Sequence, residues 1–247
     1  MTAPYGTTSP KAGAPAVVFW DNWGTLARSD YKEPVLKLQS ILGYKRETID
    51  LANISSVDES FLNTCLTTDV PSPVDQQSQD EVGFIHAVGR TYGLPVTPDM
   101  MHHFKEVTRR ERQCALTYID AMVVLRELVR RGYLNGMISN AWGFPVKTLF
   151  HEASLGDLIP EQTRFFSFRE GFAKPDPRLF VRACEKLGVK PEDCWMIGDS
   201  LENDILPARA IGMRTVLLDR EHRYARENVP ADVLLIDDPQ DILNFLP

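Results

Sequence analysis

Asp21 is the strongest candidate for a reactive residue in this chain, because it directly follows a short apolar segment. Residues 16–20 read AVVFW, a β-branched and aromatic run that is typical of a buried strand. The next residues, 21–26, read DNWGTL and predict a tight turn. Open α/β sheets place their reactive groups at the carboxyl ends of strands. Asp21 is therefore predicted to lie at the active edge of such a sheet.

Three later segments carry further polar groups, each near the end of a predicted strand. They are Ser139-Asn140 after a strand at 136–138, Lys174 beyond a strand at 164–168, and Asp199 with Asp204 after a strand at 194–197. The carboxyl ends of parallel strands meet at one edge of the sheet, so we expect these groups to converge in space.

Carboxylates, an ammonium and hydroxyls together suit displacement at phosphorus with a bound Mg²⁺. Asp21 is the expected nucleophile, and a carboxylate that attacks an anionic phosphoryl group needs its charge repulsion offset. Mg²⁺ held by the hard oxygens of Asp21 and Asp199 would offset it. Lys174 would keep Asp21 ionised. Asp204 would either bind a metal-bound water or orient Lys174, or cap the helix that follows it.

Hydrogen-bond donors to the phosphoryl oxygens are expected from the two turns. Ser139 and Thr25 can donate through their hydroxyls, and backbone amides can add to them. The predicted substrate contacts are Trp23, Gly24, Asn140 and Ala141. The expected substrate is a small anionic molecule.

These segments together resemble the motifs of the haloacid dehalogenase superfamily of aspartate-nucleophile hydrolases. The motifs are similar to Asp21-x-x-Gly-Thr-Leu, Ile138-Ser139-Asn140, Lys174-Pro175-Asp176 and Gly198-Asp199-Ser200-x-x-Asn203-Asp204. The resemblance covers roughly residues 16–220. It implies a Rossmann-like core with a helical cap inserted between the first two motifs.

Trp23 departs from the pattern of the phosphatases in this superfamily. They carry a second Asp two positions after the nucleophile, which protonates the leaving group and later activates water. An indole N–H is a donor only and cannot shuttle a proton. The backbone carbonyl of Trp23 can still serve as a metal ligand, because that ligand does not depend on the side chain.

Three interpretations remain open at Trp23. The enzyme transfers phosphoryl groups from a leaving group that needs little protonation, or the cap supplies an acid, with His102 and His103 as candidates. Alternatively it is similar to the 2-haloacid dehalogenases, which have an aromatic residue here, and Asp21 attacks carbon. Thirdly, the site is impaired and the protein binds or regulates. Asp199 and Asp204 favour the first, because the dehalogenases use no Mg²⁺ and lack the leading metal carboxylate.

Helices and strands alternate from Asp120 onward, which predicts a doubly wound parallel α/β sheet. The expected helices are 121–131, 146–153, 174–187 and 204–211, and further strands are expected at 214–218 and 232–236. Residues 31–115 carry apolar residues at helical spacing and no convincing strand. We therefore expect a disordered leader at 1–15, a core domain at 16–30 and 116–247, and a helical cap domain at 31–115.

Composition narrows the class of protein. The net charge of −7 disfavours nucleic acid and anionic membrane surfaces as partners. No segment approaches the ~20 apolar residues of a membrane helix. The four cysteines are scattered, without a metal-binding or disulfide framework, which predicts reduced thiols and a cytoplasmic protein.

Overall fold

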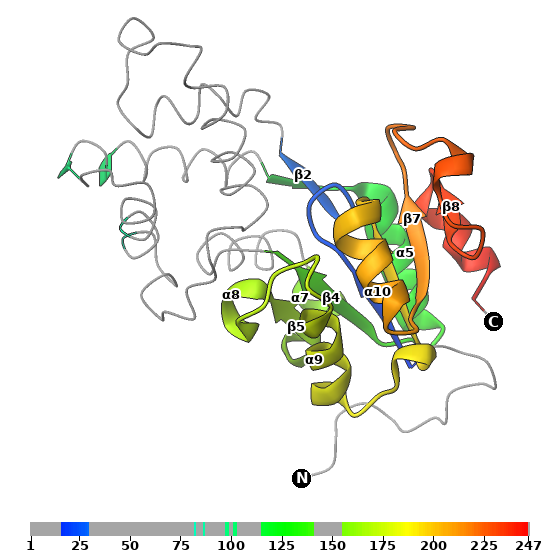
Figure 1. The fold of residues 1–247 in the computed structure, drawn as a ribbon, viewed down its shortest axis with the longest axis horizontal. Helices are drawn as coiled ribbons and strands as arrows, with labels where there is room; N and C mark the ends of the chain where they lie inside the picture. Colours follow the sequence, from blue (N-terminus) through cyan, green and yellow to red (C-terminus); the bar gives the residue numbers. More distant parts are fainter. Residues whose placement is uncertain are drawn as a thin grey trace, which may run out of the picture.

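The computed structural model describes residues 16–29, 115–140 and 155–246, with six isolated positions between 82 and 102. The expected leader, the helix at 146–153 and nearly all of the expected cap lie outside these residues. The part that is described forms a six-stranded parallel sheet with helices on both faces (Figure 1). The predicted doubly wound α/β fold is therefore confirmed.

The sheet has the order β5-β4-β1-β6-β7-β8, with β1 near its middle. Its strands are β5 (Arg164–Phe166), β4 (Asn135–Ser139), β1 (Val17–Trp20), β6 (Cys194–Gly198), β7 (Arg214–Leu218) and β8 (Leu234–Ile236). All neighbouring pairs are parallel. The chain changes direction across the sheet between β1 and β6, and sheets of this kind bind ligands at such a switch point.

Alternate residues of β1 enter two different apolar clusters, as the period of two in a strand requires. Val18 and Trp20 pack in the cluster that includes α5 (Ile119–Arg130), and η7 (Pro239–Asn244) contributes Ile242 to it. Val17 and Phe19 pack with α9 (Pro177–Leu187) and α10 (Leu206–Ala210). Burial on both faces explains why this strand is apolar throughout.

Short helical segments complete the described part of the chain. They are α7 (Leu155–Leu158), η3 (Glu161–Thr163), α8 (Ser167–Glu170), η4 (Pro191–Asp193), the π-helical turn η5 (Leu201–Ile205) and η6 (Arg226–Asn228). No helix among the described residues has the length and apolar character needed to cross a membrane.

Several predicted element boundaries are wrong, among them the start of the helix expected over 174–187, which begins at Pro177. The strand expected over 164–168 ends at Phe166, because its partner β4 ends at Ser139, which pairs with Phe166. The helix expected from Asp204 begins earlier, at η5, because the Ser200 side chain accepts a hydrogen bond from the backbone N–H of Asn203 and caps the turn. The last strand begins at Leu234 and not at Asp232.

A two-stranded antiparallel ribbon, which the sequence did not predict, joins the two ends of the inserted segment. It consists of β2 (Ala27–Ser29) and β3 (Ala115–Thr117), with Ala27 opposite Thr117. The backbone N–H of Tyr118 donates to the carbonyl of Leu26, which extends the contact toward the core. The chain thus leaves the core and returns to it at the same place.

Candidate active site

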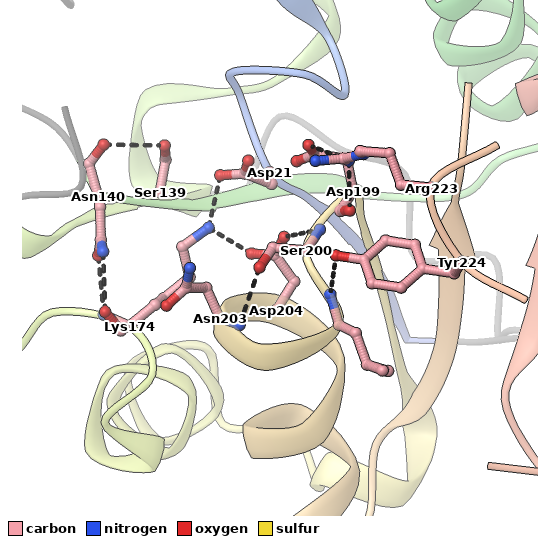
Figure 2. Close-up of polar contacts among 11 residues, drawn as sticks. Asp21, Ser139, Asn140, Lys174, Asp199, Ser200, Asn203, Asp204, Arg223 and Tyr224 are labelled. Carbon is pink, nitrogen blue, oxygen red and sulfur yellow. Dashed lines mark hydrogen bonds and ion pairs between the residues drawn. The ribbon is translucent and has the colours of Figure 1, made fainter. Parts of the chain in front are cut away.

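The expected polar groups meet at the carboxyl edge of the central strands (Figure 2). Asp21 follows β1 and its backbone N–H donates to the carbonyl of Ile197 on β6, at 2.9 Å. Ser139 ends β4, and Asp199 follows β6. Lys174 comes from the loop between α8 and α9. Groups separated by more than a hundred residues in the sequence are therefore gathered by strand order.

Lys174 bridges two carboxylates at the centre of the site. Its Nζ lies 2.5 Å from Asp21 Oδ1 and 2.5 Å from Asp204 Oδ1, and all three side chains are buried. Burial opposes the charge of Lys174, but the charges of Asp204 and Asp21 outweigh it and raise its pKa above the ordinary value of 10.5. Lys174 therefore remains a cation beside Asp21.

Asp204 holds Lys174 from the other side. Its Oδ2 accepts a hydrogen bond from the backbone N–H of Ser200 at 3.0 Å, while its Oδ1 bonds Lys174. Burial raises the pKa of Asp204 to about 7, with Lys174 opposing the rise and the nearby carboxylates adding to it. A Cβ at Gly198 would lie 2.4 Å from the Asp204 side chain, so the backbone approaches this close only because residue 198 is glycine. Of the three roles considered, the contact with Lys174 is the one observed, and the side chain that caps the following helix is Ser200.

Asp199 lies against Gly24 of the first turn and forms an ion pair with Arg223. A Cβ at Gly24, whose φ is +80°, would lie 2.4 Å from Asp199 Oδ2, so Gly24 makes room for this carboxylate. Arg223 Nη2 donates to Asp199 Oδ2 at 2.8 Å. Burial and the charge of Asp21 raise the pKa of Asp199, and Arg223 opposes this rise.

The three carboxylates fit a hard divalent cation. One oxygen from each of Asp21, Asp199 and Asp204 lies within 4.8 Å of the others. Oxygen ligands of this kind suit Mg²⁺, and their three negative charges exceed the two positive charges of Lys174 and Arg223. This cluster could hold a divalent metal.

The second predicted loop positions Lys174. The Asn140 side chain accepts from the backbone N–H of Lys174 at 2.7 Å and donates to the carbonyl of Lys174 at 2.9 Å. The described contacts of Asn140 therefore join two loops. Ser139 is buried and its hydroxyl donates to the carbonyl of Asn140 at 3.3 Å. Ala141 lies outside the described residues.

The predicted residues of the first turn differ in accessibility. Trp23 is 36% exposed, so this residue of the first turn is accessible to solvent. Thr25 is fully buried, and its Oγ1 has no hydrogen-bond partner in the described part of the chain. His102 is exposed and helical; His103 lies outside the described residues. The substrate contacts and the Trp23 carbonyl ligand stay predictions.

Sequence reasoning missed the loop that follows β7. Arg223 reaches Asp199, and Arg220 pairs with Asp120 and donates to the carbonyl of Thr25 at 3.3 Å. The available signal was topological: β7 neighbours β6, so its following loop opens at the same edge as Asp199. The charged sequence DREHR at 219–223 comes directly after that strand.

Comparison with known proteins agrees with the fold and with the motifs. Residues 15–212 match the family model of haloacid dehalogenase-like hydrolases. The chain is 34% identical to phosphatase MT3486 of Mycobacterium tuberculosis, over 88% of this chain and 93% of that protein. It is 34% identical to phosphoserine phosphatase of Thermus thermophilus over 50% of this chain and 49% of the relative. The chain spans about half the length of the first curated relatives it matches.

A solved structure shows the same fold at low sequence identity. The HAD-hydrolase YfnB from Bacillus subtilis bound to magnesium superposes with a TM-score of 0.63 at 16% identity, covering 94% of this chain and 99% of that one. The match to the family model covers well over half of the chain. The chain belongs to the haloacid dehalogenase-like hydrolase family.

Proposed function

We propose that this protein is a Mg²⁺-dependent phosphohydrolase that uses Asp21 as nucleophile on a small phosphorylated metabolite. The main support for this proposal is that one carboxylate oxygen from each of Asp21, Asp199 and Asp204 lies within 4.8 Å of the others. The phosphatase names of two relatives support phosphorus as the atom attacked.

The residues of the chain divide the reaction between them. Lys174 bonds Asp21 Oδ1, which leaves Oδ2 to attack phosphorus. The new bond joins Asp21 to phosphorus as the bond to the leaving oxygen breaks. Water then attacks the phosphorus of the aspartyl-phosphate, releases inorganic phosphate and restores Asp21. Asp21, Asp199 and Asp204 would hold Mg²⁺, which supplies positive charge against the repulsion between nucleophile and phosphoryl group.

Trp23 limits the class of leaving group. General acid–base assistance is worth about 10²–10⁴-fold, and an indole cannot provide it. The substrates that suit this site are those whose leaving oxygen is weakly basic, as in aryl or acyl phosphates. An ordinary alkyl phosphate requires an acid from the segment 31–115, where His102 is an exposed candidate.

Attack on carbon, as in a 2-haloacid dehalogenase, is the second candidate. The aromatic Trp23 favours it, since a halide leaves without a proton. The carboxylate cluster stands against it, because three like charges brought together exceed the two positive charges of Lys174 and Arg223, and the excess is costly without a metal cation.

One set of assays separates these functions. We expect phosphate release from an aryl phosphate with Mg²⁺, loss of that release in EDTA, and loss in Asp21→Asn. Halide release from a 2-haloacid in EDTA would identify the carbon chemistry instead. No turnover of either substrate, with correctly folded protein, would indicate a binding or regulatory role.

Trp23→Asp tests whether the missing acid limits alkyl phosphates. We expect kcat on an alkyl phosphate to rise by about 10–10²-fold, because a carboxyl group would protonate the leaving oxygen. The aryl phosphate is the matched control, and its kcat should change little. An unchanged kcat on the alkyl phosphate would show that the pocket, and not the acid, limits that substrate.

A further inference from the structure

Arg223 makes a two-point contact with the loop that carries Asp199. Its Nη2 donates to Asp199 Oδ2 at 2.8 Å and to the Asp199 backbone carbonyl at 2.8 Å (Figure 2). The other carboxylates of the cluster are bridged by Lys174. Asp199 therefore has a separate cation, supplied by the loop that follows β7.

The loop that presents Arg223 is anchored at both of its ends. The buried Asp219 accepts from the backbone N–H of Arg223 at 2.9 Å and from that of Tyr224 at 2.8 Å. The Tyr224 hydroxyl accepts from the backbone N–H of Leu201 at 3.2 Å, beside the Asp199 loop. These bonds fix the backbone of residue 223 against the site, so its contact with Asp199 is built into the loop.

The charge of Arg223 opposes that of an incoming metal. A cation within hydrogen-bond distance of a ligand oxygen lowers the negative potential of the cluster and occupies one of its acceptor sites. The Arg223 side chain is 43% exposed, so water can take over its hydrogen bonds when the carboxylate turns to a metal. Arg223 thus stabilises the metal-free site more than the metal-bound one.

We propose that Arg223 is a resident counter-ion of Asp199 with which Mg²⁺ competes, and that it weakens Mg²⁺ binding at this site. The proposal rests on the proposed function, in which Asp199 is a metal ligand. A counter-ion and a residue that only positions Asp199 would change the Kd for Mg²⁺ in opposite directions. A residue that only oriented Asp199 would strengthen Mg²⁺ binding, and its removal would raise Kd.

Calorimetric titration of the full chain with MgCl₂ tests the proposal without any substrate. We expect Arg223→Gln to lower the Kd for Mg²⁺ on the order of three- to tenfold, because one positive charge leaves the cluster. Arg223→Lys keeps the charge and should bind Mg²⁺ within about twofold of the wild type. Circular dichroism verifies folding of each variant.

Arg209→Gln is the matched control. Arg209 pairs with Asp232 at 2.7 Å and its side chain is 44% exposed, but Asp232 is not in the cluster. The Arg209→Gln substitution removes the same charge from the chain and should leave the Kd for Mg²⁺ within about twofold of the wild type.

The outcomes separate the proposal from the function on which it rests. No Mg²⁺ binding by the wild type would overturn both. Binding by the wild type with an unchanged or higher Kd in Arg223→Gln would overturn the counter-ion alone. A fall in Kd of the same size in Arg223→Lys or in Arg209→Gln would show that the positive charge at residue 223 is not the cause. That result would overturn the proposal.

Discussion

Two aspartates occupy the same kind of position in this fold and have different surroundings. Asp21 directly follows β1 and Asp219 directly follows β7, and both are buried. The Asp219 carboxylate accepts from two backbone N–H groups of its own loop, and Arg223 Nε lies 3.8 Å from its Oδ1. Asp21 instead bonds the Lys174 ammonium and lies with two other carboxylates. A carboxylate after a buried strand is thus a structural anchor in one place and a candidate nucleophile in the other.

The difference arises from the neighbouring strands. β1 lies between β4 and β6, so the loops that follow these two strands flank Asp21. β7 lies toward the edge of the sheet, between β6 and β8, and its own loop folds back over Asp219. Whether a strand-end carboxylate can take part in chemistry depends on what the adjacent loops bring to it.

Replacing each aspartate by asparagine should give the largest contrast. We expect Asp21→Asn to lower kcat on an aryl phosphate by at least about 10³-fold, since the nucleophile is lost. Asp219→Asn should keep kcat within about tenfold at saturating Mg²⁺ and cost about 1–3 kcal/mol of unfolding free energy, because a backbone donor loses its acceptor. Steady-state kinetics and urea unfolding measure the two effects. Comparable losses of kcat in both variants would remove the distinction.

Lys174→Met sharpens the comparison by removing the buried ammonium that hydrogen-bonds Asp21. We expect the free energy of unfolding in EDTA to fall by about 3–5 kcal/mol near neutral pH, because buried carboxylates lose their partner. Lys186→Met is the control: Lys186 bonds Glu170 at 2.6 Å but is 46% exposed, so its loss should cost about 1 kcal/mol or less. Equal losses in urea unfolding would mean that burial adds nothing to the Lys174 bridge.

The pH dependence of stability gives the smallest expected effect. The pKa of Asp204 is raised from 3.8 to about 7, so the folded protein binds this proton more tightly than the unfolded chain. Its contribution to stability is complete below pH 3.8 and is lost as pH rises toward 7. In EDTA we expect about 3 kcal/mol less unfolding free energy from this group at about pH 8 than at about pH 5. Asp204→Asn should flatten that change, and an unaltered profile would contradict the assignment to Asp204.

Much of the core could be predicted from local pattern. β1, β7 and α9 follow from apolar runs and from the Asp176-Pro177 helix start, where Asp176 accepts from the backbone N–H of Arg178. These segments carry their own signals in composition and capping. The ribbon of β2 and β3 carries none, because each strand has three residues and is stabilised by a partner distant in the sequence.

The site was predicted only in part, because some of its contacts join residues that are distant in the sequence and carry no local signal. Asp21, Lys174, Asp199 and Asp204 were identified because each belongs to a motif near a strand end. Their convergence follows from the parallel topology. Arg223 belongs to no motif, and its contact with Asp199 depends on hydrogen bonds made by Asp219 and Tyr224.

The sequence by itself determined the alternation of strands and helices, the acidic residues at the strand ends and the tryptophan that departs from the pattern. Only the tertiary structure decided that Asp204 hydrogen-bonds Lys174, that Asn140 joins two loops and that Arg223 pairs with Asp199. The physical reason is that apolar periodicity is encoded locally, whereas the partner of a buried charge is chosen by the order of strands in the sheet.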